Sequence, residues 1–108
     1  MSGEALAIVY TLYGDPDEAR RAVSDVVQAG LAACGNILSP SESYYMWNGL
    51  FERQREYPVL FKTSPARRDA LVARLGETHP YDVPAILSWD ADSAPGYARW
   101  VEDMTRQG

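Results

Sequence analysis

The chain has 108 residues, of which 46% are hydrophobic and 23% are charged, a size and balance typical of one compact globular unit. Its formal net charge of −5 argues against nucleic-acid and anionic-membrane partners, because both need clustered Lys and Arg. Cys34 is the single cysteine, which excludes a disulfide within the chain, and no stretch resembles a secretory signal or a membrane span. We therefore expect one domain over residues 1–108, located in the cytoplasm.

The first two elements are a strand and a helix. Residues 5–12 are apolar at nearly every position, which predicts a strand covered on both faces. Asp15, Pro16 and Glu18 then predict a helix start, as N-cap, first-turn proline and capping-box partner. Small and apolar residues follow at helical spacing until Gly30, which we expect to end the helix in a left-handed conformation.

A long hairpin follows. Residues 33–38 and 43–47 predict two extended segments, with a bulge or bend between them at Ser39-Pro40. Asn48-Gly49 predicts a type I′ turn, because both residues tolerate a positive φ. The return strand covers residues 50–63, in which Pro58 indicates a bulge or an unpaired edge position.

The last third of the chain predicts a helix, a strand and a further helix. Ser64-Pro65 begins the first helix, and residues 79–81 stop it. Residues 83–89 predict the last strand and residues 90–95 a loop, after which apolar residues recur at helical spacing from Tyr97 to Met104. The order βαββαβ plus a short helix predicts an α+β, ferredoxin-like antiparallel sheet with helices on one face.

The predicted hairpin is longer than the helices that should cover it. A strand of about 14 residues reaches roughly 46 Å, whereas a helix of that length covers roughly 21 Å. The uncovered half carries four large aromatic residues: Tyr44, Tyr45, Trp47 and Phe51. Either the hairpin curls back over its own sheet or a second copy of the chain covers it. We expect a second copy, with these four residues at the subunit interface.

Several spaced motifs carry a family resemblance. They are Leu31-Ala32-Ala33-Cys34-x-Asn36-Ile37, Ser43-x-Tyr45-x-Trp47-x-Gly49, Lys62-Thr63, His79-Pro80-Tyr81-x-Val83-Pro84 and Tyr97-x-x-Trp100. In this order they closely resemble the CutA-type divalent-cation tolerance family. The resemblance implies a ferredoxin-like fold, a homotrimer, a role in copper tolerance with binding of heavy metals, and no established enzymatic activity.

Cys34 and His79 are the candidate metal ligands. As the only thiol and the only imidazole they would suit copper or zinc. The predicted topology places them at opposite ends of one subunit, so a shared site would need two subunits. Alternatively, Cys34 is a small buried hydrophobe and His79 caps its helix. Some relatives carry a further cysteine and a second histidine that this chain lacks, so the resemblance implies that only His79 remains of that suggested metal cluster. We expect no required cofactor, and weak copper or zinc binding at most.

Other polar groups give weaker signals. Gly14 and Asp15 precede a helix N-terminus that could hold an anion, but Asp15 already serves there as the cap. Basic residues could recognise an acidic ligand at a subunit cleft, or could simply be solvated: Arg53, Arg55, Lys62, Arg67 and Arg68. Four carboxylates show no calcium-type spacing and are expected at the surface: Glu52, Glu56, Asp82 and Asp90.

The favoured function is a homotrimeric divalent-cation (copper) tolerance protein, with no enzymatic activity. The alternative is a trimeric signalling or scaffold protein that binds a small ligand at subunit clefts. An acylphosphatase of this fold would need an arginine-bearing loop before the first helix, and residues 13–16 contain no arginine.

Overall fold

The computed structural model describes residues 4–107. Its elements are β1 (Glu4–Tyr13), α1 (Pro16–Gln28), β2 (Cys34–Ile37), β3 (Ser41–Trp47), β4 (Leu50–Thr63), a 3-10 turn η1 (Pro65–Arg67), α2 (Arg68–Thr78), β5 (Ile86–Ser93) and α3 (Pro95–Thr105). The strands form an antiparallel sheet in the order β2-β4-β1-β5, and β3 extends the sheet by pairing with β4. The predicted ferredoxin-like α+β fold is confirmed.

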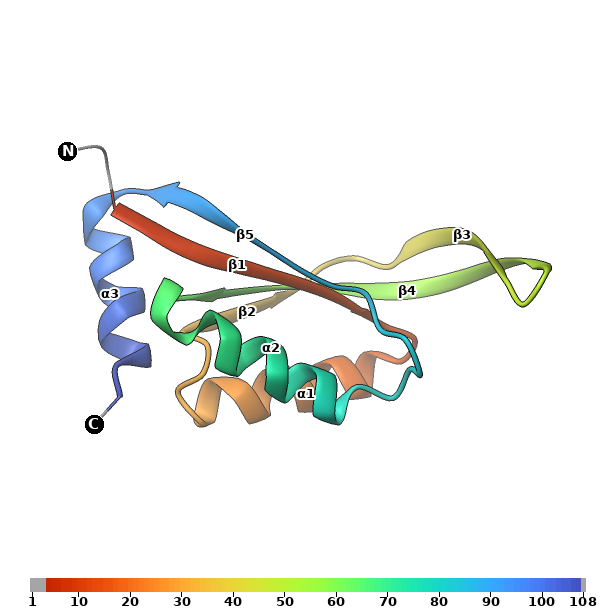
Figure 1. The fold of residues 1–108 in the computed structure, drawn as a ribbon, viewed down its shortest axis with the longest axis horizontal. Coiled ribbons are helices and arrows are strands. Elements are labelled where there is room, and N and C mark those ends of the chain that lie inside the picture. The colour runs from red at the N-terminus through yellow and green to blue at the C-terminus, as the bar shows by residue number, and fades with distance from the viewer. Residues whose placement is uncertain (1–3, 108) are drawn as a thin grey trace.

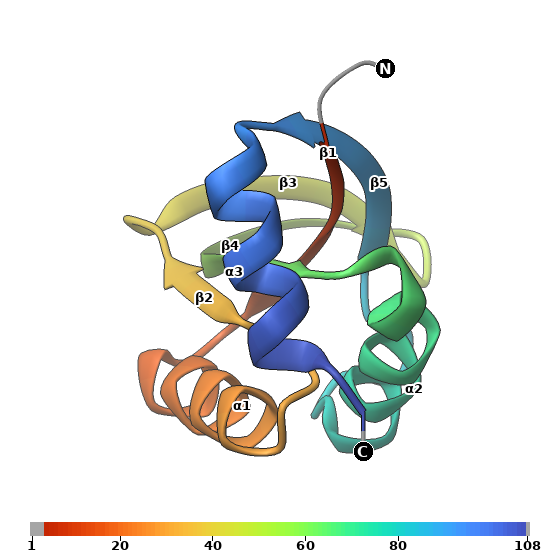
Figure 2. The same ribbon diagram turned by 90° about the vertical axis from the view of Figure 1, so that its left-hand side faces the viewer.

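The main core lies between the sheet and the helix pair α1 and α2, which cover one face (Figure 1). Val9 and Tyr13 of β1 meet Val59 and Phe61 of β4 there, and α1 and α2 supply further fully buried side chains: Ala19, Val26, Leu71 and Leu75. Figure 2 shows α3 lying across one end of the sheet rather than on either face. Val101 of α3 packs there with Leu6 and Ala33 in a second, smaller core.

Helix α1 begins and ends where its local signals predict. The Asp15 carboxylate caps it by accepting the N–H of Asp17 at 2.8 Å. A capping box would use the backbone N–H of Glu18 instead, so the predicted capping box is not formed. Gly30 has φ of 72°, and the N–H of Leu31 reaches the carbonyl of Val26 at 2.9 Å, which satisfies the last turn.

The break at Ser39-Pro40 is a bulge, and it also explains Pro58. Ile37 is opposite Val59 and Ser41 is opposite Glu56, so three residues face two across this interval. The carbonyl of Pro58 accepts the N–H of Leu38 at 2.8 Å. The nitrogen and the carbonyl of one residue in an antiparallel strand point to the same side, so the Pro58 nitrogen also faces the bulge. The missing N–H of proline therefore removes no hydrogen bond between β4 and β1. Of the two alternatives predicted at Pro58, a bulge or an unpaired edge position, the bulge is found, but its extra residue lies in the opposite strand, because Pro58 pairs with Leu12 of β1 in unbroken register.

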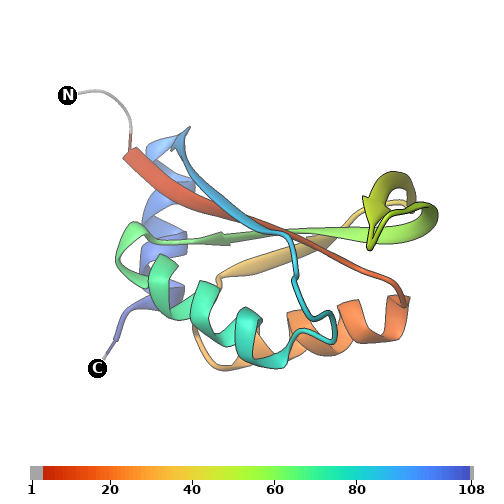
Figure 3. The ribbon, with the colours of Figure 1, turned by 45° about the vertical axis from the view of Figure 1, so that its right-hand side comes forward.

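The β3–β4 hairpin projects beyond the helices instead of curling back over its own sheet (Figures 1 and 3). Its turn has φ of 50° at Asn48 and 79° at Gly49, as a type I′ turn requires. The molecule is 48 Å long and only 27 by 22 Å across. The prediction that the hairpin outreaches its covering helices is confirmed.

Strand β5 was predicted too early in the chain. Residues 83–85 precede it, and Asp90 and Asp92, expected in a loop, belong to it because they pair with Ala7 and Ala5 of β1. Their polarity suggested a loop, but the first half of β1 needs an antiparallel partner for its backbone groups, and residues 90–93 supply it.

Helix α3 buries only part of its apolar surface. Ala98, Val101 and Thr105 are buried against the sheet end, whereas Tyr97, Trp100 and Met104 remain 40 to 50% exposed. The predicted amphipathic helix is confirmed, with most of its large side chains uncovered within one chain. None of the helices in residues 4–107 is long and apolar enough to cross a membrane.

Candidate functional site

Three aromatic rings meet where β1 ends. The imidazole of His79, just after α2, stacks on Tyr13 with ring centroids 4.4 Å apart. On its other side lies Tyr81, at 4.7 Å and tilted by 59°. The segment that joins α2 to β5 is therefore held against the last residue of β1 (Figure 1).

Both nitrogens of His79 have partners. The backbone N–H of Tyr81 donates to Nδ1 at 3.2 Å, so the ring proton lies on Nε2, which faces the carbonyl of Leu12 at 2.8 Å. Burial lowers the pKa of His79, and the hydrogen bond to Leu12 and the charges of Glu18 and Glu56 oppose that shift. Because Nδ1 accepts a hydrogen bond, the neutral imidazole is the form that fits.

A chain of hydrogen bonds runs from Tyr81 into the hairpin. Its hydroxyl donates to Oε2 of Glu56 at 2.7 Å and accepts from Nε2 of Gln54 at 3.2 Å. The hydroxyl of Tyr45 donates to Oε1 of Gln54 at 2.6 Å. Burial, and then the contact with Glu56, raise the pKa of Tyr81, so its hydroxyl stays protonated and continues to donate.

Glu56 was expected at the surface, and that prediction was wrong. Its residue is only 7% exposed, because the loop after α2 closes over the base of the hairpin. Gly14 makes this closure possible: a Cβ at that position would lie 3.0 Å from Nε2 of Gln54 and 3.2 Å from the Tyr81 hydroxyl. Within residues 4–107 no cation forms an ion pair with Glu56.

This network borders a cleft of about 480 Å³ at the base of the hairpin. Its walls come from β3, β4, the end of β1 and residues 81–85, and they include Tyr45, Trp47, Glu56, Tyr81 and Val83. Nothing local in the sequence signalled the cleft, because its walls come together only in three dimensions.

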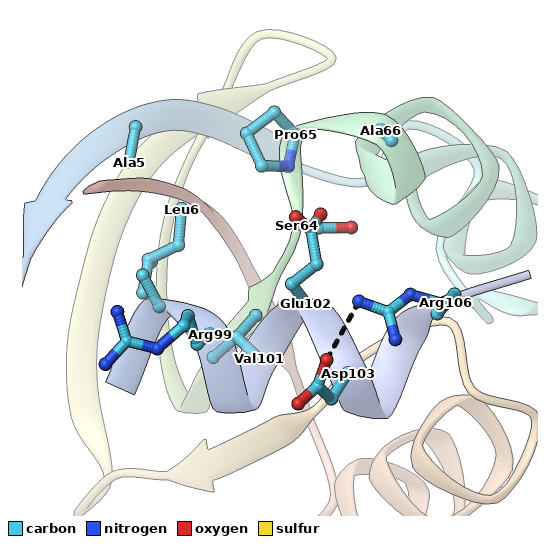
Figure 4. A pocket seen from close by; sticks show the side chains of 11 residues that line it. Ala5, Leu6, Ser64, Pro65, Ala66, Arg99, Val101, Glu102, Asp103 and Arg106 are labelled. Atoms are coloured by element: carbon cyan, nitrogen blue, oxygen red, sulfur yellow. Dashed lines mark ion pairs between the residues drawn. The ribbon is translucent and has the colours of Figure 1, made fainter. Parts of the chain in front are cut away.

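A second cavity, of about 590 Å³, lies between α3 and the start of η1 (Figure 4). Ser64 accepts a hydrogen bond from Thr105 at 3.0 Å, and Arg106 pairs with Asp103 at 2.9 Å. Arg99 points away from Ser64 in Figure 4. Ser64 and Arg106 are thus engaged with residues of α3 and Arg99 is directed apart, so these three groups do not converge on one ligand.

Cys34 lies far from His79 along the sheet. It is opposite Lys62 near the α3 end, whereas His79 contacts Leu12 at the other end of β1. The half-buried Sγ of Cys34 donates to the side-chain oxygen of Asn36 at 3.6 Å, and Lys62 donates to that same oxygen. No three His, Cys, Asp or Glu side chains within residues 4–107 are grouped to hold a metal ion.

The sheet face opposite α1 and α2 is apolar except for Lys62 of β4. Two cross-strand rows lie on it, Trp89–Ile8–Lys62 and Leu87–Tyr10–Leu60. Leu87 is 55% and Trp89 45% exposed. We call Tyr10, Leu60, Leu87 and Trp89 the open face. The sequence did contain its signal, since β1 is apolar on both sides although the helices can cover only one.

The four aromatic residues expected at a subunit interface are exposed in the single chain. Tyr45 and Trp47 share the hairpin face of Gln54 and Glu56, whereas Tyr44 and Phe51 lie on the other face, with ring centroids 6.0 Å apart. Their interface role remains a prediction, as do the metal roles of His79 and Cys34.

Comparison with known proteins identifies the family. The sequence profile of the CutA1 divalent ion tolerance protein matches residues 7–104. The chain belongs to the CutA1 family. The divalent-cation tolerance protein CutA of Pyrococcus horikoshii is 34% identical over 94% of this chain and all of its own length. That of Pectobacterium atrosepticum is 36% identical over 84% of this chain and 86% of its own.

Solved CutA structures share the whole fold. CutA1 from Ehrlichia chaffeensis superposes with a TM-score of 0.90 at 27% identity and covers 99% of both chains. CutA from Synechococcus elongatus gives a TM-score of 0.90 at 32% identity over 97% of this chain and 94% of its own. Divalent-cation tolerance, predicted from the spaced motifs, is confirmed as the family's function.

Proposed function

We propose that this CutA1-family chain acts in divalent-cation tolerance as a homotrimer, assembled through its open face and its hairpin. The observation that carries the proposal is the uncovered apolar surface at Leu87 and Trp89, continued by the aromatic residues of the hairpin. Monomeric proteins rarely expose apolar patches of this extent, so a second copy of the chain is the natural cover.

The geometry favours a ring over a two-fold dimer. The hairpin projects from one end of the molecule, whereas the open face lies on the body of the sheet (Figure 1). If the hairpin of one subunit covers the open face of the next, the contact joins two different surfaces, and contacts of this kind form a ring when the rotation between subunits closes. Three is the subunit number that the family resemblance implies.

Sedimentation equilibrium of the full chain tests this assembly. We expect three times the chain mass at micromolar concentration, and smaller species for Trp89→Asp, which places a charge on the open face. Arg21→Ala, on the outer helix α1, is the matched control and should remain trimeric. A monomeric wild-type chain would refute the proposal.

For metal, we propose weak copper or zinc binding centred on His79 and completed by another subunit. Both ring nitrogens are already hydrogen-bonded, so a metal ion must displace the Tyr81 N–H or the Leu12 carbonyl, which supports weak binding. Calorimetry on wild type, His79→Ala and Cys34→Ser decides it. Equal affinity of wild type and His79→Ala would exclude His79, and loss of binding only in Cys34→Ser would place the ion at the thiol.

We also propose that the protein turns over no substrate. Nucleophilic catalysis needs a nucleophile and a base within mutual reach, and Cys34 and His79 lie at opposite ends of the sheet. Acylphosphate or ester hydrolysis that is lost in Cys34→Ser or His79→Ala would contradict this.

The proposed compartment is the cytoplasm, where reducing conditions keep a thiol such as Cys34 free. Fractionation of cells that express the native gene tests it. Recovery of the protein with periplasmic or organelle markers would overturn the assignment.

The second candidate function that we propose is a trimeric signalling or scaffold protein that binds a small ligand at subunit clefts. The cleft of about 480 Å³ at the base of the hairpin favours it, because a ligand there would contact both the hairpin and the loop after α2. Ligand binding should then slow hydrogen exchange in residues 41–56. Unchanged exchange under saturating ligand would argue against a signalling role.

A further inference from the structure

Glu56 is a buried carboxylate without a counter-charge in its own chain. The residue is 7% exposed, and the one hydrogen-bond donor to its side chain within residues 4–107 is the Tyr81 hydroxyl, on Oε2. Burial of an ionised carboxylate is costly unless a cation or several donors compensate it. One neutral hydroxyl is incomplete compensation, so this site has a deficit of positive charge.

The cleft that Glu56 lines adds no cation. Its walls contain no Lys, Arg or His, and Asp82 contributes a further carboxylate at the mouth. The nearby His79 is held in its neutral form by the N–H that donates to Nδ1. The guanidinium groups of Arg53 and Arg55 belong to the opposite face of the hairpin, since the register places Gln54 and Glu56 together on the other.

The other walls suit an organic cation better than a metal ion. Tyr45, Trp47 and Tyr81 line the cleft, and aromatic rings attract alkylammonium groups through cation–π interactions. A hard divalent ion would instead need several oxygen ligands, and no group of three His, Cys, Asp or Glu side chains is present in the part of the chain that the structure describes.

The surrounding hydrogen bonds hold the carboxylate ready. Tyr45 anchors Gln54, Gln54 donates to Tyr81, and Tyr81 donates to Glu56, so each side chain in the series fixes the next. Only Oε2 of Glu56 is used in this series, which leaves Oε1 for a ligand.

We propose that the cleft at the base of the hairpin binds a small organic ammonium compound, whose charge pairs with Glu56 and whose alkyl groups contact Tyr45 and Tyr81, while Trp47, nearer the turn, stays available for the proposed subunit contact. This inference rests on the second proposed function, a small-ligand site in this cleft, and names the chemical class of its ligand. It does not depend on the metal roles of His79 or Cys34.

Calorimetry with choline and its neutral isostere 3,3-dimethyl-1-butanol tests the inference on the full-length protein in its native assembly. The two probes match in shape and differ in charge, so choline should bind at least about tenfold more tightly. A further titration with n-butylammonium distinguishes a site for primary ammonium groups from one for quaternary ammonium groups. Glu56→Gln keeps an acceptor for Tyr81 and removes the charge, so it should reduce the preference for choline to what the aromatic rings alone provide. Glu77→Gln, an exposed change of equal charge on α2, should retain it.

Three results would overturn the inference, and each has a different consequence for the cleft as a ligand site. Equal binding of choline and the alcohol would refute the ammonium class but leave the cleft as a ligand site. No binding of either, together with dissociation of Glu56→Gln into smaller species in sedimentation, would show that a cation of another subunit pairs with Glu56. Magnesium or zinc binding that is lost in Glu56→Gln, without choline binding, would show a metal site instead.

Discussion

The imidazole of His79 lies almost flat on the ring of Tyr13, with 13° between the two planes. Tyr13 ends β1 and is 1% exposed, so the stack ties the segment after α2 to a fixed point in the core. The same segment carries Tyr81, whose hydroxyl holds Glu56. The cleft at the base of the hairpin therefore takes its shape from a contact between residues 66 positions apart.

The first prediction concerns pH. Burial lowers the pKa of His79, so the unfolded chain binds the imidazole proton at higher pH than the folded chain does. The contribution of this pKa difference to the free energy of unfolding is fully present above about pH 6.5, the ordinary pKa of histidine. It is lost as the pH falls toward the pKa of His79 in the folded chain. Urea unfolding at pH 7.5, 6.5 and 5.5, at one protein concentration, should show this loss. His79→Gln should show a shallower pH dependence, and equal dependence in both proteins would contradict the argument.

The second prediction concerns the Tyr13 hydroxyl, which is buried with no hydrogen-bond partner in the described residues. Burial, and then the charge of Glu18, raise the pKa of Tyr13 to about 12. Tyr13→Phe keeps the stack on His79, so the free energy of unfolding should be unchanged or rise by up to about 1 kcal/mol. Tyr81→Phe, which removes a bonded hydroxyl, should instead lower it by about 1–3 kcal/mol. A clear loss of stability in Tyr13→Phe would mean that its hydroxyl has a partner.

The third prediction concerns the contact between β2 and α1. A Cβ added at Gly35 would lie 3.0 Å from Cγ1 of Val23 and 3.3 Å from the ring of Phe61. Gly35→Ala should therefore lower the free energy of unfolding by about 1–3 kcal/mol through overpacking. Val23→Ala removes the closest methyl groups, so the double variant should lose less than the sum of the two single losses. Strictly additive losses in denaturant titrations would show that the methyl is accommodated elsewhere.

The fourth prediction concerns Trp47 as an anchor of the proposed assembly. Trp47→Ala should weaken association by roughly 2 kcal/mol or more, as loss of a buried aromatic anchor does. Sedimentation over a range of concentrations measures this, with Arg21→Ala as the control. A sedimentation profile and melting curve identical to those of the wild type would remove Trp47 from the interface.

Some features followed from the sequence by itself, because their causes are local. Asp15, Gly30 and Asn48-Gly49 act through the backbone angles and side-chain reach of a few residues, and each was correctly predicted. The order of elements and the long hairpin also followed, since periodicity and length need no tertiary contact. The spaced motifs indicated the family, and the match of the CutA1 profile to residues 7–104 confirmed it.

Tertiary structure decided what depends on partners distant in the chain. Asp90 and Asp92 have loop-like polarity, yet they form β5 because β1 needs their backbone groups. Glu56, within a polar run of the hairpin, was expected in solvent, but Tyr81 from 25 residues away closes over it. Whether a carboxylate is buried depends on what folds against it, and neighbouring residues in the sequence do not contain that information.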